Sequence, residues 1–290
     1  MRLLSLESLK SIDNDGWLYV KTAVTTFIDT WNVTHKAARD QESLKDIHTL
    51  CLFVGYPRSG HSIVGSVIDA HPNGLMAHRM DSLQYVQLGY TEPELFYMMK
   101  RNSERFARTG RTLTGYQYNI PNRLTISEKT LKVIGDQEGN RSSVRLGQDP
   151  DLLRRFRDRK RVKIKLIHVT RNPFDNITTW ALRTQSTLEF NIERYFDRAR
   201  NVEKIKRTSG LDLLDVRHED LVANFDFSCR RLLGFLDLDV EERFLLDCKS
   251  IVYASPHKSR SRVDWPRELI SEVEARSAEF PFLSEYHFAS

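Results

Sequence analysis

The sequence predicts an α/β fold in three layers, with a central, mainly parallel sheet flanked by helices. Two observations support this prediction. Short apolar segments typical of buried strands alternate with segments of helical periodicity, and this alternation favours parallel strands joined by helical crossovers. The chain has 290 residues, 40% of them hydrophobic, which is enough to bury a substantial core.

The first strand and helix are predicted on either side of a glycine-containing turn. Residues Leu50 to Gly55 are apolar and β-prone, and the segment from His61 to Ala70 has helical character. Further strands are predicted at 131–135, 162–170 and 211–216. Helices are predicted at 92–107, 149–158, 173–206 with a break, and 220–236. Apolar residues at steps of three and four predict one more helix near the N-terminus, through Trp17, Val20, Val24, Phe27 and Trp31.

Charge and composition favour a soluble, cytoplasmic protein with no membrane partner. No segment has the apolar length of a signal peptide core or a membrane span. The net charge of +5 permits an anionic ligand without requiring nucleic acid, and no nucleic-acid partner is predicted. The most basic run, 154–165, is interpreted as solvated surface with Lys163 and Lys165 facing outward. The scattered cysteines, Cys51, Cys229 and Cys248, have no metal-ligand spacing.

The turn after the first strand, "GYPRSGHS", follows the spacing of a phosphate-binding Walker loop. Gly55 and Gly60 let the backbone approach a phosphate, and the helix that follows directs its positive end at the same place. The lysine position of that loop is occupied by His61. Arg58 supplies a permanent charge instead, three residues upstream.

A second segment, "IHVTRNPFDNITTW", covers residues 167–180. The pair of segments resembles the 5'-phosphosulfate loop and the 3'-phosphate motif of sulfotransferases that use 3'-phosphoadenosine 5'-phosphosulfate (PAPS). In the second motif, the resemblance implies that Arg171 at a strand end and Thr179 on the following helix hold one phosphate between them. The segments 215–238 and 256–266 resemble further parts of that family, so the resemblance covers about residues 49–266. Residues 1–48 are then a helical extension, and 267–290 a C-terminal helix and tail of one domain.

The resemblance implies a P-loop-type fold and an enzyme that transfers a sulfuryl group from PAPS to a hydroxyl or amine, without a metal. Arg58 takes the role of the cation at the bridging oxygen of the donor. The implied donor contacts are Arg58, Ser59, Gly60, His61, Ser62, Arg171 and Thr179, with Lys258, Ser259 and Arg260 as further phosphate contacts.

The general base is expected near the end of the second strand. Relatives carry a His-Glu pair there, whereas this chain has His78 followed by Arg79. An imidazole can accept a proton at neutral pH, so His78 is the first candidate. The carboxylates Asp81, Asp136 and Glu138 remain open as alternatives, as does His61 inside the loop.

The acceptor is predicted to be a small molecule, and a natural product is favoured. Gln137 and Glu138 replace a basic pair of the family, and an acidic patch at 136–138 suits a cationic acceptor, for which a guanidinium toxin of the saxitoxin type is one example. The predicted acceptor contacts are Arg79, Tyr116, Gln117 and Tyr118. The alternatives are a carbohydrate sulfotransferase, a P-loop kinase or nucleotide hydrolase, and a non-catalytic nucleotide-binding module.

Overall fold

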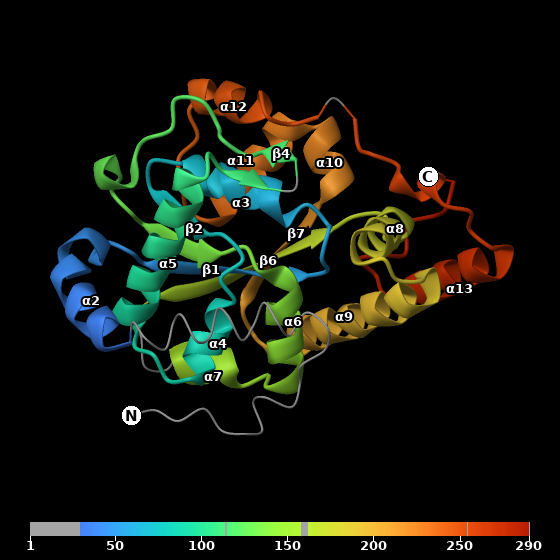
Figure 1. Cartoon of the computed structure of the whole chain (residues 1–290), viewed down its shortest axis with the longest axis horizontal. Helices are drawn as coiled ribbons and strands as arrows, with labels where there is room; N and C mark the ends of the chain where they lie inside the picture. Colours follow the sequence, from blue (N-terminus) through green and yellow to red (C-terminus); the bar gives the residue numbers. More distant parts are fainter. Residues whose placement is uncertain (1–29, 114, 158–161, 254, 290) are drawn as a thin grey trace.

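The computed structural model describes residues 30–113, 115–157, 162–253 and 255–289. Its centre is a sheet of five parallel strands with helices on both faces (Figure 1), which confirms the predicted α/β class and layering. The strands are β1 (Thr49–Gly55), β2 (Gly74–Ala77), β5 (Val133–Asp136), β6 (Lys163–Thr170) and β7 (Asp212–Arg217). Most of the helix predicted through Trp17, Val20, Val24, Phe27 and Trp31 lies outside the described residues; Trp31 falls in a helix that begins at Thr30.

The strand order is β2-β5-β1-β6-β7, so the direction of the connections reverses at β1. In open parallel sheets, such a reversal leaves a crevice beyond the carboxyl ends of the strands on either side of it. β1 pairs with β5 from Thr49 to Leu52 and with β6 along its whole length. The segments that follow β1, β5 and β6 therefore meet at one edge of the sheet.

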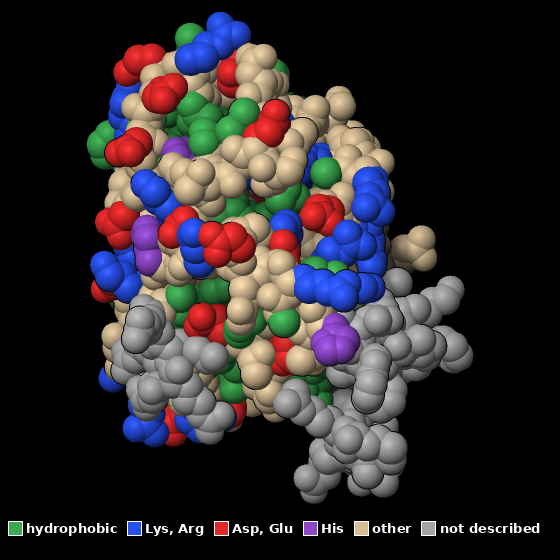
Figure 2. Space-filling model, turned by 90° about the vertical axis from the view of Figure 1, so that its left-hand side faces the viewer, with side chains coloured by type: hydrophobic (Ala, Val, Ile, Leu, Met, Phe, Trp, Pro, Cys, Tyr) green, Lys and Arg blue, Asp and Glu red, His purple; other side chains and the backbone are tan. Residues whose placement is uncertain are grey.

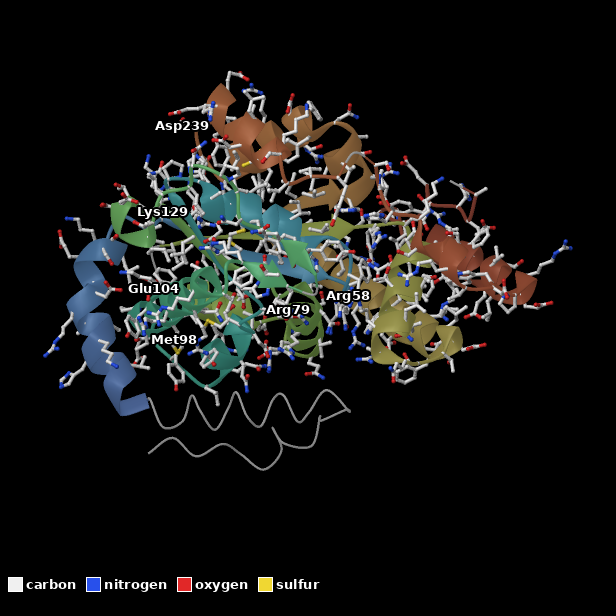
Figure 3. All side chains as sticks on the ribbon, turned by 45° about the horizontal axis from the view of Figure 1, so that its top comes forward. Arg58, Arg79, Met98, Glu104, Lys129 and Asp239 are labelled. Atoms are coloured by element: carbon white, nitrogen blue, oxygen red, sulfur yellow. The ribbon has the colours of Figure 1, made fainter. Side chains whose placement is uncertain are left out.

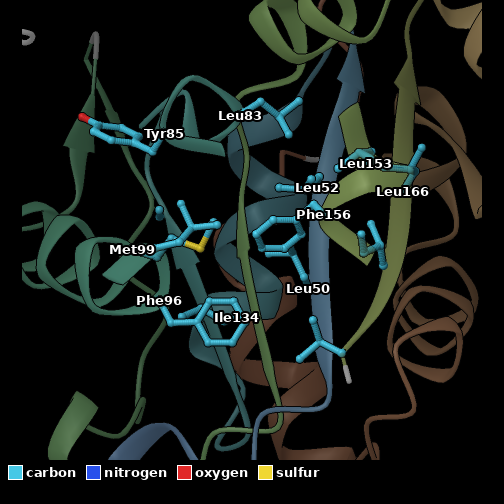
Figure 4. Packing of buried hydrophobic residues seen from close by; sticks show 14 of the residues in the cluster. Leu50, Leu52, Leu83, Tyr85, Phe96, Met99, Ile134, Leu153, Phe156 and Leu166 are labelled. Atoms are coloured by element: carbon cyan, nitrogen blue, oxygen red, sulfur yellow. The ribbon is translucent and has the colours of Figure 1, made fainter. Parts of the chain in front are cut away.

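Alternation along β1 divides the core between the two faces of the sheet. Leu50, Leu52 and Val54 pack toward one cluster of apolar residues, and Cys51 and Phe53 toward another. The first cluster is covered by α2 (Thr30–Leu44), α4 (Ser82–Gln87), α5 (Glu92–Arg108), α6 (Gly139–Gln148), α7 (Leu152–Arg157) and α9 (Leu188–Thr208) (Figure 1). Figure 4 shows part of this packing, with side chains from α4, α5 and α7 around Leu50 and Leu52. The second is covered by α3 (His61–Ala70), α10 (His218–Ala223), α11 (Phe225–Phe235) and α12 (Glu242–Lys249).

A third apolar cluster binds the C-terminal segment to the end of β1. The helices α8 (Pro173–Thr184) and α13 (Arg267–Ala278) pack with α9, and the tail adds Phe280, Leu283 and Tyr286. Tyr56, directly after β1, is buried in this cluster. The Tyr286 hydroxyl donates to Glu219 Oε2 at 3.0 Å, and Glu219 Oε1 accepts from the amide of Asn172 at 2.9 Å. The tail therefore supports the chain on both sides of the crevice.

One helix beside the crevice, α6, escaped sequence analysis because it carries few apolar residues. Its two glycines mark close contacts instead. A Cβ on Gly139 would lie 2.2 Å from Cε1 of His61, and one on Gly147 would lie 2.1 Å from Oδ1 of Asn201. Small side chains thus let α6 lie against the loop and α9. The buried positions Gly139, Ser142, Ser143 and Leu146 recur with helical spacing, but only Leu146 is a large apolar residue.

The structure corrects one surface assignment. Lys163 is exposed as predicted, but Lys165 is buried. Its ammonium donates to the carbonyl of Phe235 at 2.6 Å and to Oδ2 of Asp237 at 2.7 Å. A buried lysine needs such partners, and these come from the end of α11, a contact that the local sequence does not contain.

Basic and acidic side chains are interspersed over much of the side of the molecule shown in Figure 2, apart from a group of basic side chains toward one edge of that view. Within the described part of the chain, no helix is long and apolar enough to cross a membrane.

Candidate active site

A cavity of about 290 Å³ lies at the carboxyl ends of β1, β5 and β6. Its wall combines the β1–α3 loop, the turn into α6, one side of α8, the short hairpin of β3 (Thr112–Leu113) and β4 (Tyr116–Gln117), and the segment 251–257. The wall includes many residues singled out from the sequence: Arg58, Gly60, His61, Ser62, Arg79, Tyr116, Gln117, Tyr118, Glu138, Arg171 and Thr179. Figure 3 shows Arg58 and Arg79 beside each other near the middle of the molecule.

The β1–α3 loop holds three residues with positive φ: Gly55 at 130°, Arg58 at 68° and Gly60 at 105°. A Cβ on Gly60 would lie only 2.6 Å from Nδ1 of His218, so glycine is required there for space as well as for φ. Arg58 holds a conformation that costs a side-chain-bearing residue on the order of 1–3 kcal/mol. The rest of the loop sustains it, in part through Ser59 Oγ, which donates to the carbonyl of Tyr56 at 2.9 Å.

The first turn of α3 is open to an anion. Gly60 is its N-cap residue and gives no side-chain hydrogen bond to the first amides of the helix. Those N–H groups lie at His61 and Ser62, in the wall of the cavity. An uncapped helix N-terminus that faces a cavity is a site where phosphate or sulfate oxygens replace the missing cap.

His61 does not replace the Walker lysine as a cation. Burial, with a further contribution from His168, lowers the pKa of His61 to about 3, so its ring is neutral at physiological pH. Its Nε2 lies 3.2 Å from Ser59 Oγ, and the ring packs edge-on against Phe53. His61 therefore packs between the β1–α3 loop and α6, and Arg58 supplies the positive charge of the loop.

Arg171 lies directly after β6 and ties two distant segments together. Its Nη1 donates to the carbonyl of Arg58 at 3.3 Å, and its Nη2 donates to the carbonyl of His257 at 2.6 Å and to Ser259 Oγ at 3.3 Å. Burial lowers the pKa of Arg171, although the guanidinium stays charged. Its Nε is buried without a hydrogen-bond partner among the described residues.

Thr179 lies on α8 in the same wall. Its hydroxyl donates to the carbonyl of Asp175 at 2.7 Å, so binding a phosphate through this group requires the hydroxyl hydrogen to turn toward the ligand. The neighbouring Thr178 is buried and accepts from the indole of Trp265 at 3.0 Å, which fixes the C-terminal segment on α8.

The three further candidates for phosphate contacts, Lys258, Ser259 and Arg260, differ in their surroundings. Lys258 is exposed, and Ser259 contacts Arg171. Arg260 is buried, and its guanidinium donates to both oxygens of Asp175, at 3.1 and 2.8 Å, and to the carbonyls of His287 and Phe288. None of the three lines the cavity. Arg260 anchors the segment that carries His257 and Ser259 to α8, and its guanidinium is occupied by these contacts.

His78, the first candidate for the base, stands behind the wall. Its ring stacks on Phe106 with centroids 3.8 Å apart, and its Nδ1 is hydrogen-bonded to the side-chain amide of Gln137, which does line the cavity. Burial, and then the charge of Arg79, lower the pKa of His78 to about 4. The imidazole is therefore a weak base that reaches the cavity only through Gln137.

Two of the three candidate carboxylates, Asp81 and Asp136, are hydrogen-bonded to other groups of the protein. Asp81 pairs with Arg145 through two hydrogen bonds of 2.8 and 2.7 Å. Asp136 accepts from the backbone amides of Met80, Ser82 and Glu138 at 2.8 to 3.2 Å, and burial raises its pKa to about 7. Both are buried and lie outside the cavity wall, so the predicted acidic patch at 136–138 contributes a single carboxylate to the cavity.

That carboxylate belongs to Glu138, the N-cap residue of α6. Its Oε1 accepts from the amide of Arg141 at 3.2 Å, and its Oε2 is buried with no hydrogen-bond partner. Two guanidinium groups lie near Oε2, Nε of Arg79 at 3.7 Å and Nη1 of Arg141 at 4.0 Å. Glu138 therefore offers the cavity an oxygen that can accept a proton.

Several wall residues were missed by sequence reasoning. They are Asn140 and Arg141 on α6, Arg183 on α8, His218 at the start of α10, and Tyr253 and His257. The RHED segment that resembles the sulfotransferase family contains His218, which was the available signal for it. Burial, and then the charge of Arg171, lower its pKa to about 3, so the ring is neutral. The α6 residues gave no signal because the helix itself was not predicted.

The hairpin side of the cavity carries tyrosines. Tyr116 packs edge-on against Tyr253 at 5.8 Å, and burial raises the pKa of Tyr118. The residues on either side of the hairpin are held to α3 by Asp69, whose Oδ2 lies 2.5 Å from Nη1 of Arg111 and 2.9 Å from Nη2 of Arg123. The ammonium of Lys129 (Figure 3) donates to the carbonyls of Asp69, His71 and Gly74.

Neither the family models nor the curated proteins compared with this sequence give a match. Solved structures do. The chain is similar to the sulfotransferase STF9 from Mycobacterium avium, with 10% identity over 85% of this chain and 80% of that one and a TM-score of 0.48. It is similar to the sulfotransferase domain of the Synechococcus PCC 7002 olefin synthase, with 18% identity over 77% and 83% and a TM-score of 0.44. A mouse sulfotransferase, SULT7A1, complexed with PAP gives 15% identity over 82% and 87% and a TM-score of 0.42.

Proposed function

We propose that this protein transfers a sulfuryl group from PAPS to a small-molecule acceptor and releases 3',5'-bisphosphoadenosine (PAP). The observation that carries the proposal is the hydrogen bond from Arg171 to the Arg58 carbonyl, because it joins two sequence motifs that lie more than a hundred residues apart. Each motif brings its own phosphate-binding group to one cavity. A nucleotide with separate 3' and 5' anionic groups fits this pair of sites.

The donor would be held by groups that already lie in the cavity wall. The α3 amides and Arg58 are placed to bind the 5'-phosphosulfate, and Arg171, through its unpartnered Nε, together with Thr179 is placed to bind the 3'-phosphate. The donor supplies the sulfuryl group and a phosphate leaving group. A fixed cation and oriented amides stabilise negative charge that develops on such a leaving group.

Glu138 is the favoured base among the candidates. It is the carboxylate in the described wall, and its Oε2 accepts no hydrogen bond. Nε2 of His78 also lacks a hydrogen-bond partner, but that ring is stacked behind Gln137 and outside the wall, and the carboxylates of Asp81 and Asp136 are occupied. During transfer, the bond from sulfur to the acceptor oxygen forms and the bond from sulfur to the bridging oxygen of PAPS breaks. The acceptor proton passes to Glu138.

Calorimetry with PAP tests donor binding. We expect micromolar binding that does not depend on Mg²⁺. Tight binding of Mg-ATP with no binding of PAP would instead indicate a kinase or nucleotide hydrolase. The neutral His61 argues against that function, because it stands where such enzymes have a lysine.

Turnover of labelled PAPS against a panel of phenols, sugars and amines tests the base. Glu138→Gln should lower kcat at least about 100-fold and leave the Kd of PAP unchanged, since general-base catalysis contributes about 10²–10⁴-fold. His78→Gln serves as the matched variant and should cost much less. Equal losses in both variants, or a full kcat in Glu138→Gln, would refute the assignment of the base. PAP binding without transfer to any acceptor would favour a non-catalytic nucleotide-binding module.

A further inference from the structure

We infer that ionised Asp136 is a positioning residue for the transfer: it holds Glu138 and Arg79 in place at the cavity, and transfer slows when its carboxylate takes up a proton. This inference rests on the proposed function and deepens it, because Glu138 is the base proposed there. Asp136 lies outside the cavity wall, so it acts through the backbone that carries the other two residues.

The carboxylate of Asp136 joins two segments that reach the cavity from different elements. Asp136 is the last residue of β5 and is 1% exposed. Its Oδ1 accepts from the amides of Met80 and Glu138, both at 3.2 Å, and its Oδ2 accepts from the amide of Ser82 at 2.8 Å. One side chain therefore fixes the turn between β2 and α4 against the start of α6.

The turn between β2 and α4 is strained and needs this support. Arg79 has a φ of 50° and Asp81 a φ of 62°, and residues with a side chain hold such a conformation only where neighbouring contacts impose it. The amide of Met80, between them, donates to Asp136. Nε of Arg79 lies 3.7 Å from Oε2 of Glu138 in the cavity wall, so a change in the turn reaches the surroundings of the base.

The hydrogen bonds of Asp136 favour its ionised form. Every hydrogen-bond partner of this side chain in the described part of the chain is an amide donor. Protonation removes the negative charge that strengthens these bonds and adds an O–H for which the three amides provide no acceptor. Burial works in the opposite direction and raises the pKa of Asp136 to about 7. The carboxylate therefore changes its charge near neutral pH.

Other charged groups lie on the segments packed against Asp136, which are β1, the chain from β2 into α4, the buried face of α5, and α6 with its N-cap residue. Their charged and titratable groups are Cys51, His78, Arg79, Asp81, Tyr85, Glu94, Glu138, Arg141 and Arg145. The carboxylates of Glu138 and Asp81 add to the rise in the pKa of Asp136. Burial lowers the pKa of His78 to about 4, so this ring is already neutral where Asp136 titrates.

Activity and stability should depend on pH in opposite senses through Asp136. Above about pH 7 the carboxylate is ionised and holds the turn and the base, and as the pH falls through 7 this support is lost and kcat falls. A carboxyl group whose pKa is raised by folding contributes stability that is present at low pH and is lost as the pH rises through the folded value. A carboxylate that served stability alone would not produce opposite trends.

NMR of the PAP-bound protein tests the geometry without an acceptor. The backbone amide signals of Met80, Ser82 and Glu138 should shift with one common midpoint near pH 7, because all three amides donate to the titrating carboxylate. In Asp136→Asn, this common titration should be absent. Amide signals that do not shift in the original protein, or that shift with unrelated midpoints, would overturn the inference.

Transfer from labelled PAPS tests the effect on the reaction. The acceptor is the member of a panel of phenols, sugars and amines with the highest turnover, or water where none reacts, which releases sulfate and PAP. In the original protein, kcat should fall by about tenfold per pH unit below 7. In Asp136→Asn, Nδ2 is a donor directed at donors, so kcat at pH 8 should fall by about 10- to 100-fold and lose this dependence, while the Kd of PAP stays unchanged.

Asp239→Asn is the matched control, because Asp239 is exposed and lies outside the cavity wall (Figure 3). This variant should keep the original kcat and pH profile. Urea titrations measure stability separately. As the pH falls from 7 toward 4, the original protein should gain stability relative to Asp136→Asn while its kcat decreases.

The outcomes separate the inference from the proposed function. Failure of the original protein to bind PAP would overturn the proposed function itself. With PAP binding intact, a full kcat of Asp136→Asn at pH 8, or the same fall of kcat below pH 7 in this variant as in the original, would overturn only the role of Asp136. If Asp136→Asn does not fold, the amide titration and the pH profile of the original protein decide, and a kcat that stays constant through pH 7 overturns the inference.

Discussion

Arg171→Lys is the substitution that most directly tests how the donor site is assembled. The substitution keeps the positive charge at the end of β6 and removes the planar guanidinium group, whose nitrogens donate in fixed directions. Arg171 uses Nη1 for the Arg58 carbonyl and Nη2 for the His257 carbonyl and Ser259 Oγ, and it keeps Nε for a ligand. A lysine has one nitrogen at the end of a flexible chain, so it cannot serve the loop, the 257–259 segment and a phosphate in the same fixed directions.

The expected magnitude follows from these contacts. Hydrogen bonds that involve a charged group contribute about 1.5–3 kcal/mol each. If the ammonium restores all but one of them, donor binding loses about that amount, which corresponds to a roughly 10- to 100-fold rise in the Kd of PAP. A simple charge effect would instead leave the Kd of PAP almost unchanged, since the net charge is the same.

Calorimetric titration of PAP into the purified variant measures this loss. Arg105→Lys, on the exposed face of α5, is the matched control and should bind PAP like the original protein. If the Kd of PAP for Arg171→Lys stays within twofold of the original, the geometry of the guanidinium group is not what binds PAP, and the charge alone is sufficient. A similar loss in Arg105→Lys would show that the effect is not specific to the site.

Three further predictions follow from the same geometry. Gly60→Ala should abolish PAP binding, because its Cβ would lie 2.6 Å from His218 and its φ of 105° is strained, whereas Gly89→Ala, with a φ of 79° and open space, should cost stability alone; calorimetry and thermal melting distinguish these results. Because the folded-state pKa values of His61 and His218 are about 3, below the unfolded value near 6.5, the stability present at neutral pH should fall as the pH drops from about 6.5 toward 3. Each ring should contribute about 1.4 kcal/mol per pH unit to that loss, and urea titrations at several pH values should show a shallower slope for His218→Gln. Asp69→Asn should loosen the segment that follows the hairpin and raise the KM of the acceptor while the Kd of PAP stays constant; a change in PAP affinity alone would contradict this.

Much of the fold could be predicted because its signals are local. The apolar run of β1, the glycines after it and the periodicity of α5 each lie within one segment, and the predicted layers agree with the observed sheet. The break predicted within 173–206 lies between α8 and α9, where Gln185 adopts a φ of 53° and Thr187 caps the next helix. The helix α6 was missed because three of its four buried positions, Gly139, Ser142 and Ser143, carry small residues that do not stand out as apolar, although they recur with helical spacing.

The candidate site also has parts that could be predicted from the sequence and parts that could not. Arg58 could be named from its place in a Walker-like loop, and Arg171 and Thr179 from the resemblance of their segment to a sulfotransferase motif, since the residues of each motif are close in sequence. The base could not be chosen, because burial and partners decide which carboxylate is available. Asp81 and Asp136 look as suitable as Glu138 in the sequence, and the structure gives them Arg145 and backbone amides as partners.

The sequence by itself therefore determined the α/β class and indicated the two candidate phosphate-binding motifs, because each is a pattern of neighbouring residues. Only the tertiary structure decided that His61 is neutral, that Arg260 serves as an anchor and that one carboxylate stands among arginines in the cavity. The physical reason is that pKa values, ion pairs and the balance of charge depend on which groups are buried together. Those groups come from β2, α6 and α8, far apart along the chain.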